Sequence, residues 1–288
     1  MAIESLRALE KASENKDIFE VVLDSDCTDR GVSREASLEK MHALYAAIRR
    51  AREGYDPALH SASGMVGGDG AKMREYVQKG KTICGDYIGQ VIAQALEMGE
   101  SNACMKCIVA APTAGSCGVL PAVLLPYQAR EGLDDNTMVR AMYVAGAIGQ
   151  VVAAKASIAG AAGGCQAEIG TASAMGAAAL CYLGGGNAQA VCHAAAIAIK
   201  AMLGLVCDPI AGLVEVPCVK RNAAGAVIAM SSADMALAGI RSAVPPDEVI
   251  LAMREVGDKM DVSLKETGVG GVAGTPFGQK IAEKMGMA

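Results

Sequence analysis

Three cysteines, Cys165, Cys207 and Cys218, are the residues whose setting best suits chemistry. Each lies in a stretch rich in glycine or proline, where a helix is expected to begin or end. Backbone N–H groups at such boundaries approach a ligand sulfur and stabilise the charge of a thiolate or a bound cluster. The spacing is not that of a ferredoxin-like C-x-x-C-x-x-C run. Spacing alone therefore allows a metal centre held from separate loops but does not specify one.

The rest of the ten cysteines have weaker settings. Cys181 and Cys192 fall in apolar segments and are predicted to pack in the core. Cys104 and Cys107 form a C-x-x-C pair without a second pair or a βαβ pattern, so we interpret them as coincidental buried thiols. The N-terminus has no secretion-signal pattern, so free thiols or ligands are expected rather than disulfides, in a reducing cytoplasm. The isolated cysteines are Cys27, Cys84 and Cys117.

Two loops rich in small polar residues, 61–70 and 112–116, are candidates for holding an anionic substrate. Hydroxyls and backbone amides before a helix suit a carboxylate, and ordinary turn or capping chemistry is the alternative. Neither loop matches a P-loop or a dinucleotide-binding pattern, which disfavours nucleotides. Pyridoxal phosphate would need a pocket lysine, for which Lys155 is the candidate. The candidate substrate-binding residues are Ser61, Ser63, Gly64, Thr113, Gly115 and Ser116.

The elements that must position these residues are predicted to be helices. Tryptophan is absent and aromatic residues make up 3% of the chain, so Ala, Gly and Met must fill the core. Small residues let helices approach closely, whereas a β-sandwich would want β-branched and aromatic residues. We predict an all-α, mostly helical single compact domain with Gly/Ser-rich loops at helix ends forming the site.

Apolar spacing predicts helices over residues 33–52, about 71–78 and around 87–98. Residues 2–30 are predicted to form short amphipathic helices, with a break marked by Asp26, Asp29 and Gly31. We find no linker, tandem repeat or charge block, so residues 1–288 are predicted to form one domain with a mobile helical N-terminal region, 1–32.

The apolar stretch over residues 141–164 is long enough to raise the question of a membrane span. It contains Gln150, Lys155 and Ser157, and its bulk is Ala and Gly, so we interpret it as one or two buried helices. The net charge is −5 and no basic stripe occurs. A nucleic-acid partner and a membrane location are therefore not expected.

The segments around the three cysteines resemble those of iron–sulfur L-serine dehydratases. Residues 160–170, GAAGGCQAEIG, are similar to the segment with one cluster ligand, and residues 207–222, CDPIAGLVEVPCVKRN, to the segment with the other two. Residues 112–116, PTAGS, and 265–268, KETG, also match. The resemblance is to the alpha subunit and covers roughly residues 35–276.

The resemblance implies a [4Fe-4S] cluster held by Cys165, Cys207 and Cys218, with one iron that has no protein ligand and acts as a Lewis acid. The implied reaction is the deamination of L-serine to pyruvate and ammonia, a step of amino-acid degradation and gluconeogenesis. The general base is unassigned: a histidine of a separate beta subunit is one candidate, and Glu168 is the candidate in this chain. Glu168 and Glu215 are otherwise expected to orient backbone or to pair with Lys220 or Arg221.

The chain departs from the family in two places. An Asn-Ala-Ser-Ile-Ser-Gly pattern before the first ligand reads KASIAG over residues 155–160, so a role tied to that asparagine is not carried over. The beta portion, with its Ser-His-Thr segment, is absent, so a beta partner chain is expected. Three alternatives stay open: a related lyase acting on threonine or cysteine, an iron–sulfur electron-transfer or redox protein with Cys117 as a fourth ligand, and an inactive helical binding subunit.

Overall fold

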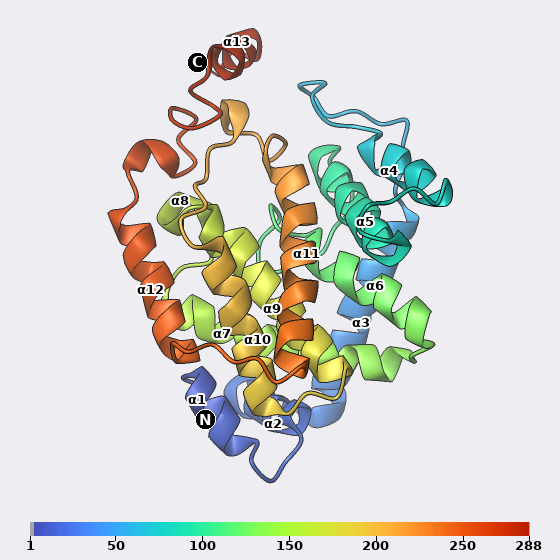
Figure 1. Ribbon diagram of the computed structural model, residues 1–288, viewed down its shortest axis with the longest axis vertical. Helices are drawn as coiled ribbons and strands as arrows, with labels where there is room; N and C mark the ends of the chain where they lie inside the picture. The colour runs from blue at the N-terminus through green and yellow to red at the C-terminus, as the bar shows by residue number, and fades with distance from the viewer. Residues whose placement is uncertain (1–2, 288) are drawn as a thin grey trace.

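The computed structural model describes residues 3–287, so residues 1, 2 and 288 of the predicted domain lie outside the described residues. Within this range the chain is helical, and the β-type pairing consists of one isolated bridge between Cys207 and Lys265. The all-α prediction is therefore confirmed (Figure 1). The α-helices are α1 (Leu6–Ala12), α2 (Ile18–Arg30), α3 (Arg34–Glu53), α4 (Asp69–Gln78), α5 (Asp86–Ala103), α6 (Val119–Glu131), α7 (Asp135–Lys155), α8 (Gly160–Gly163), α9 (Thr171–Leu183), α10 (Ala188–Met202), α11 (Cys218–Leu237), α12 (Pro246–Lys259) and α13 (Pro276–Lys284). A π-helix, η1 (Gln166–Gly170), and two 3₁₀ turns, η2 (Ile210–Gly212) and η3 (Val262–Leu264), complete the described elements.

The helices predicted over residues 33–52, 71–78 and 87–98 correspond to α3, α4 and α5. The predicted break at Asp26 and Asp29 is wrong, because both residues lie inside α2. Asp26 forms an ion pair with Arg30 at 2.8 Å, one helical turn later, and such pairs stabilise a helix. The break predicted at Gly31 is confirmed, because the helix ends there and the Gly31 φ of 63° lies in the left-handed region typical of a helix C-cap.

Helix α9 lies at the centre of the bundle and packs against α6, α7, α10 and α11. Every residue from Thr171 to Cys181 is buried. Small side chains make this packing close: a Cβ on Gly176 would lie 3.2 Å from the Ala229 Cβ and 3.3 Å from Val123. The predicted core role of Cys181 and Cys192 is confirmed, since both are fully buried within α9 and α10.

The first two helices are docked on the bundle. Leu6, Leu9 and Leu23 are fully buried, and the Asp247 carboxylate at the start of α12 accepts the Leu6 N–H at 3.0 Å. The same carboxylate lies 3.8 Å from the Lys155 ammonium at the end of α7. Mobility of residues 1–32 stays a prediction, and these contacts define the docked arrangement from which any motion would start.

The apolar stretch over residues 141–164 folds as the second part of α7 followed by the short α8. Helix α7 is long and apolar enough to cross a membrane by length and composition, but 67% of its apolar window is buried inside the protein. The interpretation of this stretch as buried helices is therefore confirmed for α7 as far as Val152, whereas residues 153–162 are mostly half-buried or exposed.

Figure 1 shows α11 running through the middle of the molecule, with the loop that leads into it at the top. Helices α1 and α2 lie at the opposite end, and α13 carries the chain's C-terminal end away from the top. The glycine-rich segments do lead into helices, as predicted. Residues 112–116 precede α6, 160–165 precede η1, 207–212 precede α11, and 268–274 precede α13. The next question is whether these loop ends meet.

Candidate active site

Cys165 is held between the short helix α8 and the π-helix η1. Gly164, with φ of 78°, turns the chain at this point, and a Cβ there would lie 2.6 Å from the Met260 side chain. The next residue, Gln166, is fully buried. Its amide donates to the Met253 carbonyl at 3.0 Å and accepts from the Gly204 N–H at 2.9 Å. The backbone that carries Cys165 is thereby fixed from two sides.

Cys207 is held by a segment far away in the sequence. Its N–H donates to the Leu264 carbonyl at 2.9 Å, and its carbonyl accepts the Glu266 N–H at 2.6 Å. Asp208 beside it accepts the Val272 N–H at 2.8 Å and forms an ion pair with Arg221 at 2.9 Å. The segment around residues 262–274 thus closes over the Cys207 loop.

Cys218 is the first residue of α11, and the amide of Asn222 connects it to the 112–118 loop. The Asn222 side chain donates to the carbonyls of Cys218 at 3.0 Å and Gly115 at 2.8 Å. Its oxygen accepts the Gly118 N–H at 2.9 Å. One buried side chain therefore sets the third cysteine against the second predicted loop.

The three cysteines are buried and act on one another electrostatically, with exposed fractions of 2%, 3% and 8% in chain order. Burial raises the pKa of Cys165 to about 11, against the lowering effect of the nearby Arg221 guanidinium. Burial also raises the pKa of Cys218 to about 12, with a further contribution from Cys165. The pKa of Cys207 is raised by burial and then by Cys165, Glu168, Glu266 and Cys218. The structure therefore gathers the three predicted cysteines in one region.

The donor set fits a multi-iron cluster better than a single ion. Among residues 3–287, no three His, Cys, Asp or Glu side chains are grouped closely enough to hold one metal ion. A cluster contacts its cysteines through different iron atoms, so its ligands lie farther apart than those of one ion. The backbone at Gly160 also approaches the site closely: a Cβ there would lie 2.7 Å from both the Cys207 Sγ and a Glu168 carboxylate oxygen.

The first predicted loop meets the cysteine loops through Glu215. The Ser61 hydroxyl donates to the Glu215 carboxylate at 2.7 Å, and the Ser63 hydroxyl donates to the same oxygen. Glu215 is 5% exposed and lies between Cys207 and Cys218 in the sequence. Gly64, at φ of 76°, has open space where a Cβ would stand. The loop is rich in acceptor oxygens, because both hydroxyl protons are directed at a carboxylate.

The second predicted loop meets Glu168, which follows Cys165 within η1. A Cβ on Gly115 would lie 3.5 Å from a Glu168 carboxylate oxygen. Burial raises the pKa of Glu168, the Thr113 hydroxyl that donates to it opposes this shift, and Glu266 adds to it. The Ser116 hydroxyl is fully buried and is used inside the loop, 3.1 Å from the Thr113 hydroxyl and 3.3 Å from the Ala111 carbonyl.

The expected pairing of Glu168 and Glu215 with Lys220 or Arg221 is wrong. Arg221 bonds to Asp208 and to the Val206 carbonyl at 2.7 Å. Lys220 lies on the exposed face of α11, where its ammonium is 3.2 Å from Asp69. Consecutive residues on a helix point in different directions, which explains why the two cations have different partners.

The other cysteines differ in burial and in partners. Cys117 is fully buried, and burial raises its pKa to about 12. Its Sγ lies 3.8 Å from the Met98 carbonyl. The C-x-x-C pair is not buried as expected, because Cys104 is half-buried and Cys107 is exposed at the end of α5. All ten cysteines are free thiols, as the sequence predicts.

Sequence reasoning missed three residues that shape this region: Asn222, Arg221 as a partner of Cys165, and Glu266. Asn222 follows Cys218 by one helical turn, and this spacing was the available signal. Arg221 lies next to it on the same helix. Glu266, at φ of 63°, had no local signal because its contact with Cys207 crosses a long stretch of sequence.

Comparison with known proteins decides the family. A family model described as "Serine dehydratase alpha chain" matches residues 13–273. The chain belongs to this family of serine dehydratase alpha chains. The resemblance found in the sequence is thus confirmed, and with it the ammonia-lyase class of enzyme.

Two relatives are similar to this family member over most of both chains. A "Probable L-serine dehydratase, alpha chain" of Bacillus subtilis (strain 168) is 49% identical over 245 residues, covering 85% of this chain and 80% of the relative. The "L-serine dehydratase, alpha chain" of Peptoniphilus asaccharolyticus is 43% identical over 272 residues, covering 88% and 93%. An "L-serine dehydratase" of Mycobacterium tuberculosis (strain CDC 1551 / Oshkosh) is 40% identical over 253 residues, which is 86% of this chain but 50% of that longer protein.

Proposed function

We propose that this chain is the cluster-carrying catalytic subunit of an L-serine dehydratase, which converts L-serine to pyruvate and ammonia. One observation carries the proposal: three buried cysteines from separate loops gather beside Glu168 in a chain of the serine dehydratase alpha family. The relatives named above, all called L-serine dehydratases, support serine rather than threonine or cysteine as the substrate.

In this proposal Cys165, Cys207 and Cys218 hold a [4Fe-4S] cluster. When bound, the cluster supplies a Lewis acid through the iron without a protein ligand, which weakens the C–O bond of the substrate hydroxyl. Arg221, held by Asp208 at 2.9 Å, places a fixed positive charge near Cys165 and favours its thiolate. The Cys117 thiol donates to the Met98 carbonyl at 3.8 Å, and burial raises its pKa, so we propose three cysteine ligands rather than four.

We propose that loops 61–70 and 112–116 both bind the substrate and that each contacts a different group of it. Ser61 and Ser63 direct their hydroxyl protons at Glu215, so this loop presents lone pairs and a carboxylate. Such an acceptor-rich site suits an ammonium group and repels a carboxylate. We therefore assign the loop with Gly64 to the substrate ammonium rather than to its carboxylate.

The loop with Thr113, Gly115 and Ser116 lies beside the group of this chain best suited to hold a proton. Thr113 fixes the Glu168 carboxyl, and the raised pKa of Glu168 brings its protonation closer to neutral pH. The glycine backbone at Gly115 leaves the carboxyl open on one side. In this proposal Ser116 shapes the loop, and Glu168 exchanges a proton with the substrate or with a base contributed by the beta subunit.

A beta subunit is the proposed partner, because two close relatives are named alpha chains. The longer relatives extend well beyond the part that matches this chain, which supports a second functional portion in those enzymes. We also propose a cytoplasmic location, since ten free thiols and an oxygen-sensitive cluster need a reducing compartment. Nothing in the fold points to a nucleic-acid partner.

The test is an anaerobic assay of pyruvate formation. The chain is reconstituted with iron and sulfide, combined with the beta subunit from the same source, and supplied with L-serine, L-threonine or L-cysteine. The proposal expects pyruvate from L-serine, loss of activity on exposure to air, and loss in Cys165→Ala, Cys207→Ala and Cys218→Ala. Activity that survives iron removal would contradict it, and a faster reaction with threonine or cysteine would move the assignment to a related lyase.

A further inference from the structure

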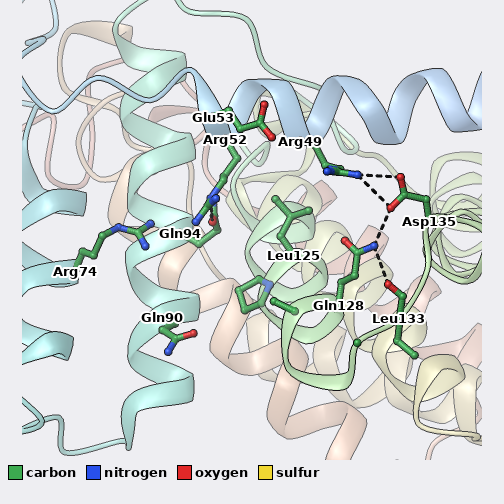
Figure 2. A pocket seen from close by; sticks show the side chains of 13 residues that line it. Arg49, Arg52, Glu53, Arg74, Gln90, Gln94, Leu125, Gln128, Leu133 and Asp135 are labelled. Carbon is green, nitrogen blue, oxygen red and sulfur yellow. Dashed lines mark hydrogen bonds and ion pairs between the residues drawn. The ribbon is translucent and has the colours of Figure 1, made fainter.

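A cavity away from the cysteine site lies among α3, α5, α6 and the start of α7. Its volume is about 520 Å³, which falls in the range of small-molecule sites. Three arginines line it: Arg49 and Arg52 from α3, and Arg74 from α4 (Figure 2). It shares no lining residue with the loops or cysteines of the candidate active site.

Two of these arginines are already paired with carboxylates. Arg49 donates to both oxygens of Asp135, at 2.9 and 3.2 Å. Arg74 donates to Glu97, which is 2% exposed, with its Nε 2.7 Å from the carboxylate. Each pair balances its own charge, so neither guanidinium needs a further anion.

Arg52 is different, because no carboxylate in residues 3–287 forms an ion pair with it. Its Nε donates to the Gln94 side-chain oxygen at 3.2 Å. Figure 2 shows the guanidinium directed across the cavity wall toward Gln94. Glu53, the next residue, also lines the cavity but is exposed at its edge.

Gln94 supplies the second observation. Its side chain is buried, with 3% of the residue exposed, and lines the cavity. Its amide nitrogen is buried and has no hydrogen-bond partner among the described residues. A buried N–H donor without a partner loses its hydrogen bonds to water and gains none in return, so natural proteins rarely leave one unsatisfied. The donor lies beside a guanidinium that lacks a counter-charge.

We propose that this cavity binds a small organic carboxylate, which accepts from the Arg52 guanidinium and from the Gln94 amide. A planar carboxylate matches the fork of a guanidinium, and the neighbouring amide satisfies its second oxygen. Gln90, one helical turn before Gln94 on α5, offers a further donor and acceptor to the rest of the ligand, whereas Gln128 is engaged with Leu133 and Asp135. The proposal does not depend on the proposed dehydratase activity.

The test is a titration of the full-length chain with small ligands at low ionic strength. Binding is monitored by NMR chemical shifts. Three probes of nearly equal shape are compared: succinate, succinamate and the neutral succinamide. Succinate and succinamate are expected to shift the resonances of cavity residues and to saturate, whereas succinamide leaves them unchanged. Equal binding of succinamide, or no saturable shift with either carboxylate, would overturn the proposal.

Two variants localise the binding, and a third is the control. Arg52→Met removes the guanidinium and is expected to weaken carboxylate binding about 10- to 100-fold, the loss of one charged hydrogen-bonded pair. Gln94→Glu keeps the side-chain shape but supplies Arg52 with its own carboxylate, and is expected to abolish binding. Arg50→Met makes the same change at an exposed position on α3 that does not line the cavity. Equal losses in Arg52→Met and Arg50→Met would contradict the site.

Two further arms distinguish the source of the ligand. Saturable binding of inorganic phosphate without binding of succinate would overturn the choice of a carboxylate. The succinate titration is then repeated in the complex with the beta subunit. Binding that persists in the complex supports a free small molecule, whereas complete loss would show that the partner's own side chains occupy the cavity and would overturn the proposal.

Discussion

Glycine and cysteine residues occur both in the core around α9 and in the loops that carry Cys165, Cys207 and Cys218, and their roles differ between these two regions. In the core, Gly225 stands against Ile169 and Ser173, and Gly176 against Ala229 and Val123. At the site, Gly160 stands against the Cys207 thiol and the Glu168 carboxylate. A missing side chain lets helices approach each other closely in one region and lets the backbone approach reactive groups closely in the other.

The cysteines follow the same division. Cys181 and Cys192 are fully buried within regular helices of the core. Cys165 and Cys218 lie at helix ends and Cys207 lies in the loop between α10 and η2, and, besides burial, Cys165 raises the pKa of both other thiols. Burial alone therefore does not separate a packing cysteine from a ligand. Position at a helix end or in a loop does, since thiols also affect one another in the core, where burial raises the pKa of Cys192 and Cys181 adds to this shift.

The largest expected effect separates these two kinds of cysteine. Cys207→Ser should lower pyruvate formation by at least about 10³-fold, because the cluster loses one of three thiolates, while the apo chain keeps its thermal stability. Cys181→Ser should leave iron binding intact but lower stability by about 1–3 kcal/mol, because a hydroxyl replaces a thiol in an apolar core. Activity and thermal unfolding are measured on both. If the two variants lose activity and stability to a similar extent, the distinction between ligand cysteines and core cysteines is contradicted.

Gly160→Ala tests the close approach of the backbone to the site thiol. The new Cβ would stand 2.7 Å from the Cys207 Sγ, so iron content after reconstitution should fall, and activity with it by about 10- to 100-fold. Circular dichroism should show an unchanged helical fold. Normal iron content and activity would mean that the absence of a side chain at position 160 is not needed for cluster assembly or for the reaction.

Gly225→Ala tests the core use of glycine. The added Cβ would lie 2.7 Å from an Ile169 methyl carbon and 2.9 Å from the Ser173 hydroxyl. This overpacking should cost about 1–3 kcal/mol of unfolding free energy. The matched change Gly146→Ala, on α7 with nothing near its Cβ, should stabilise by roughly 0.5–1 kcal/mol. Chemical denaturation measures the unfolding free energy of both variants. An undiminished stability of Gly225→Ala would show that the core can accommodate the added methyl group.

The smallest effect concerns His193 on α10, which the candidate active site does not use. Burial lowers the pKa of His193, with Arg241 and Lys200 acting in the same direction and Glu10 opposing them. Its Nδ1 accepts the Ser242 N–H at 3.2 Å, which requires a neutral ring nitrogen. The unfolded chain therefore binds the proton more tightly, and stability present above about pH 6.5 should be lost as the pH falls below it. Thermal melts of the wild type and His193→Asn should differ in this slope, and parallel profiles would contradict the assignment.

The sequence predicts the helices well wherever the signal is local. Helix α3 follows from apolar residues at helical spacing and from Ser33, whose hydroxyl accepts the Ala36 N–H at 3.2 Å. The exception, the break expected at Asp26, failed because an ion pair one turn along the helix outweighed the turn preference of aspartate.

The site could be predicted only in part. The cysteines and the two loops stand out by composition and by family resemblance. The partners of those residues could not be predicted, because they come from distant segments: Glu215 accepts from Ser61, and Glu266 pairs with Cys207. Such contacts depend on how helices pack, which no local pattern encodes.

The most direct measurement is Mössbauer spectroscopy of the chain reconstituted with ⁵⁷Fe, recorded with its beta subunit before and after addition of L-serine. Three cysteine ligands leave one iron free, so the account predicts that about one quarter of the iron signal changes when serine binds. The same change should be absent in Cys207→Ser. A spectrum in which all irons stay equivalent and unaffected by serine would contradict the claim that Cys165, Cys207 and Cys218 hold a cluster whose open iron meets the substrate.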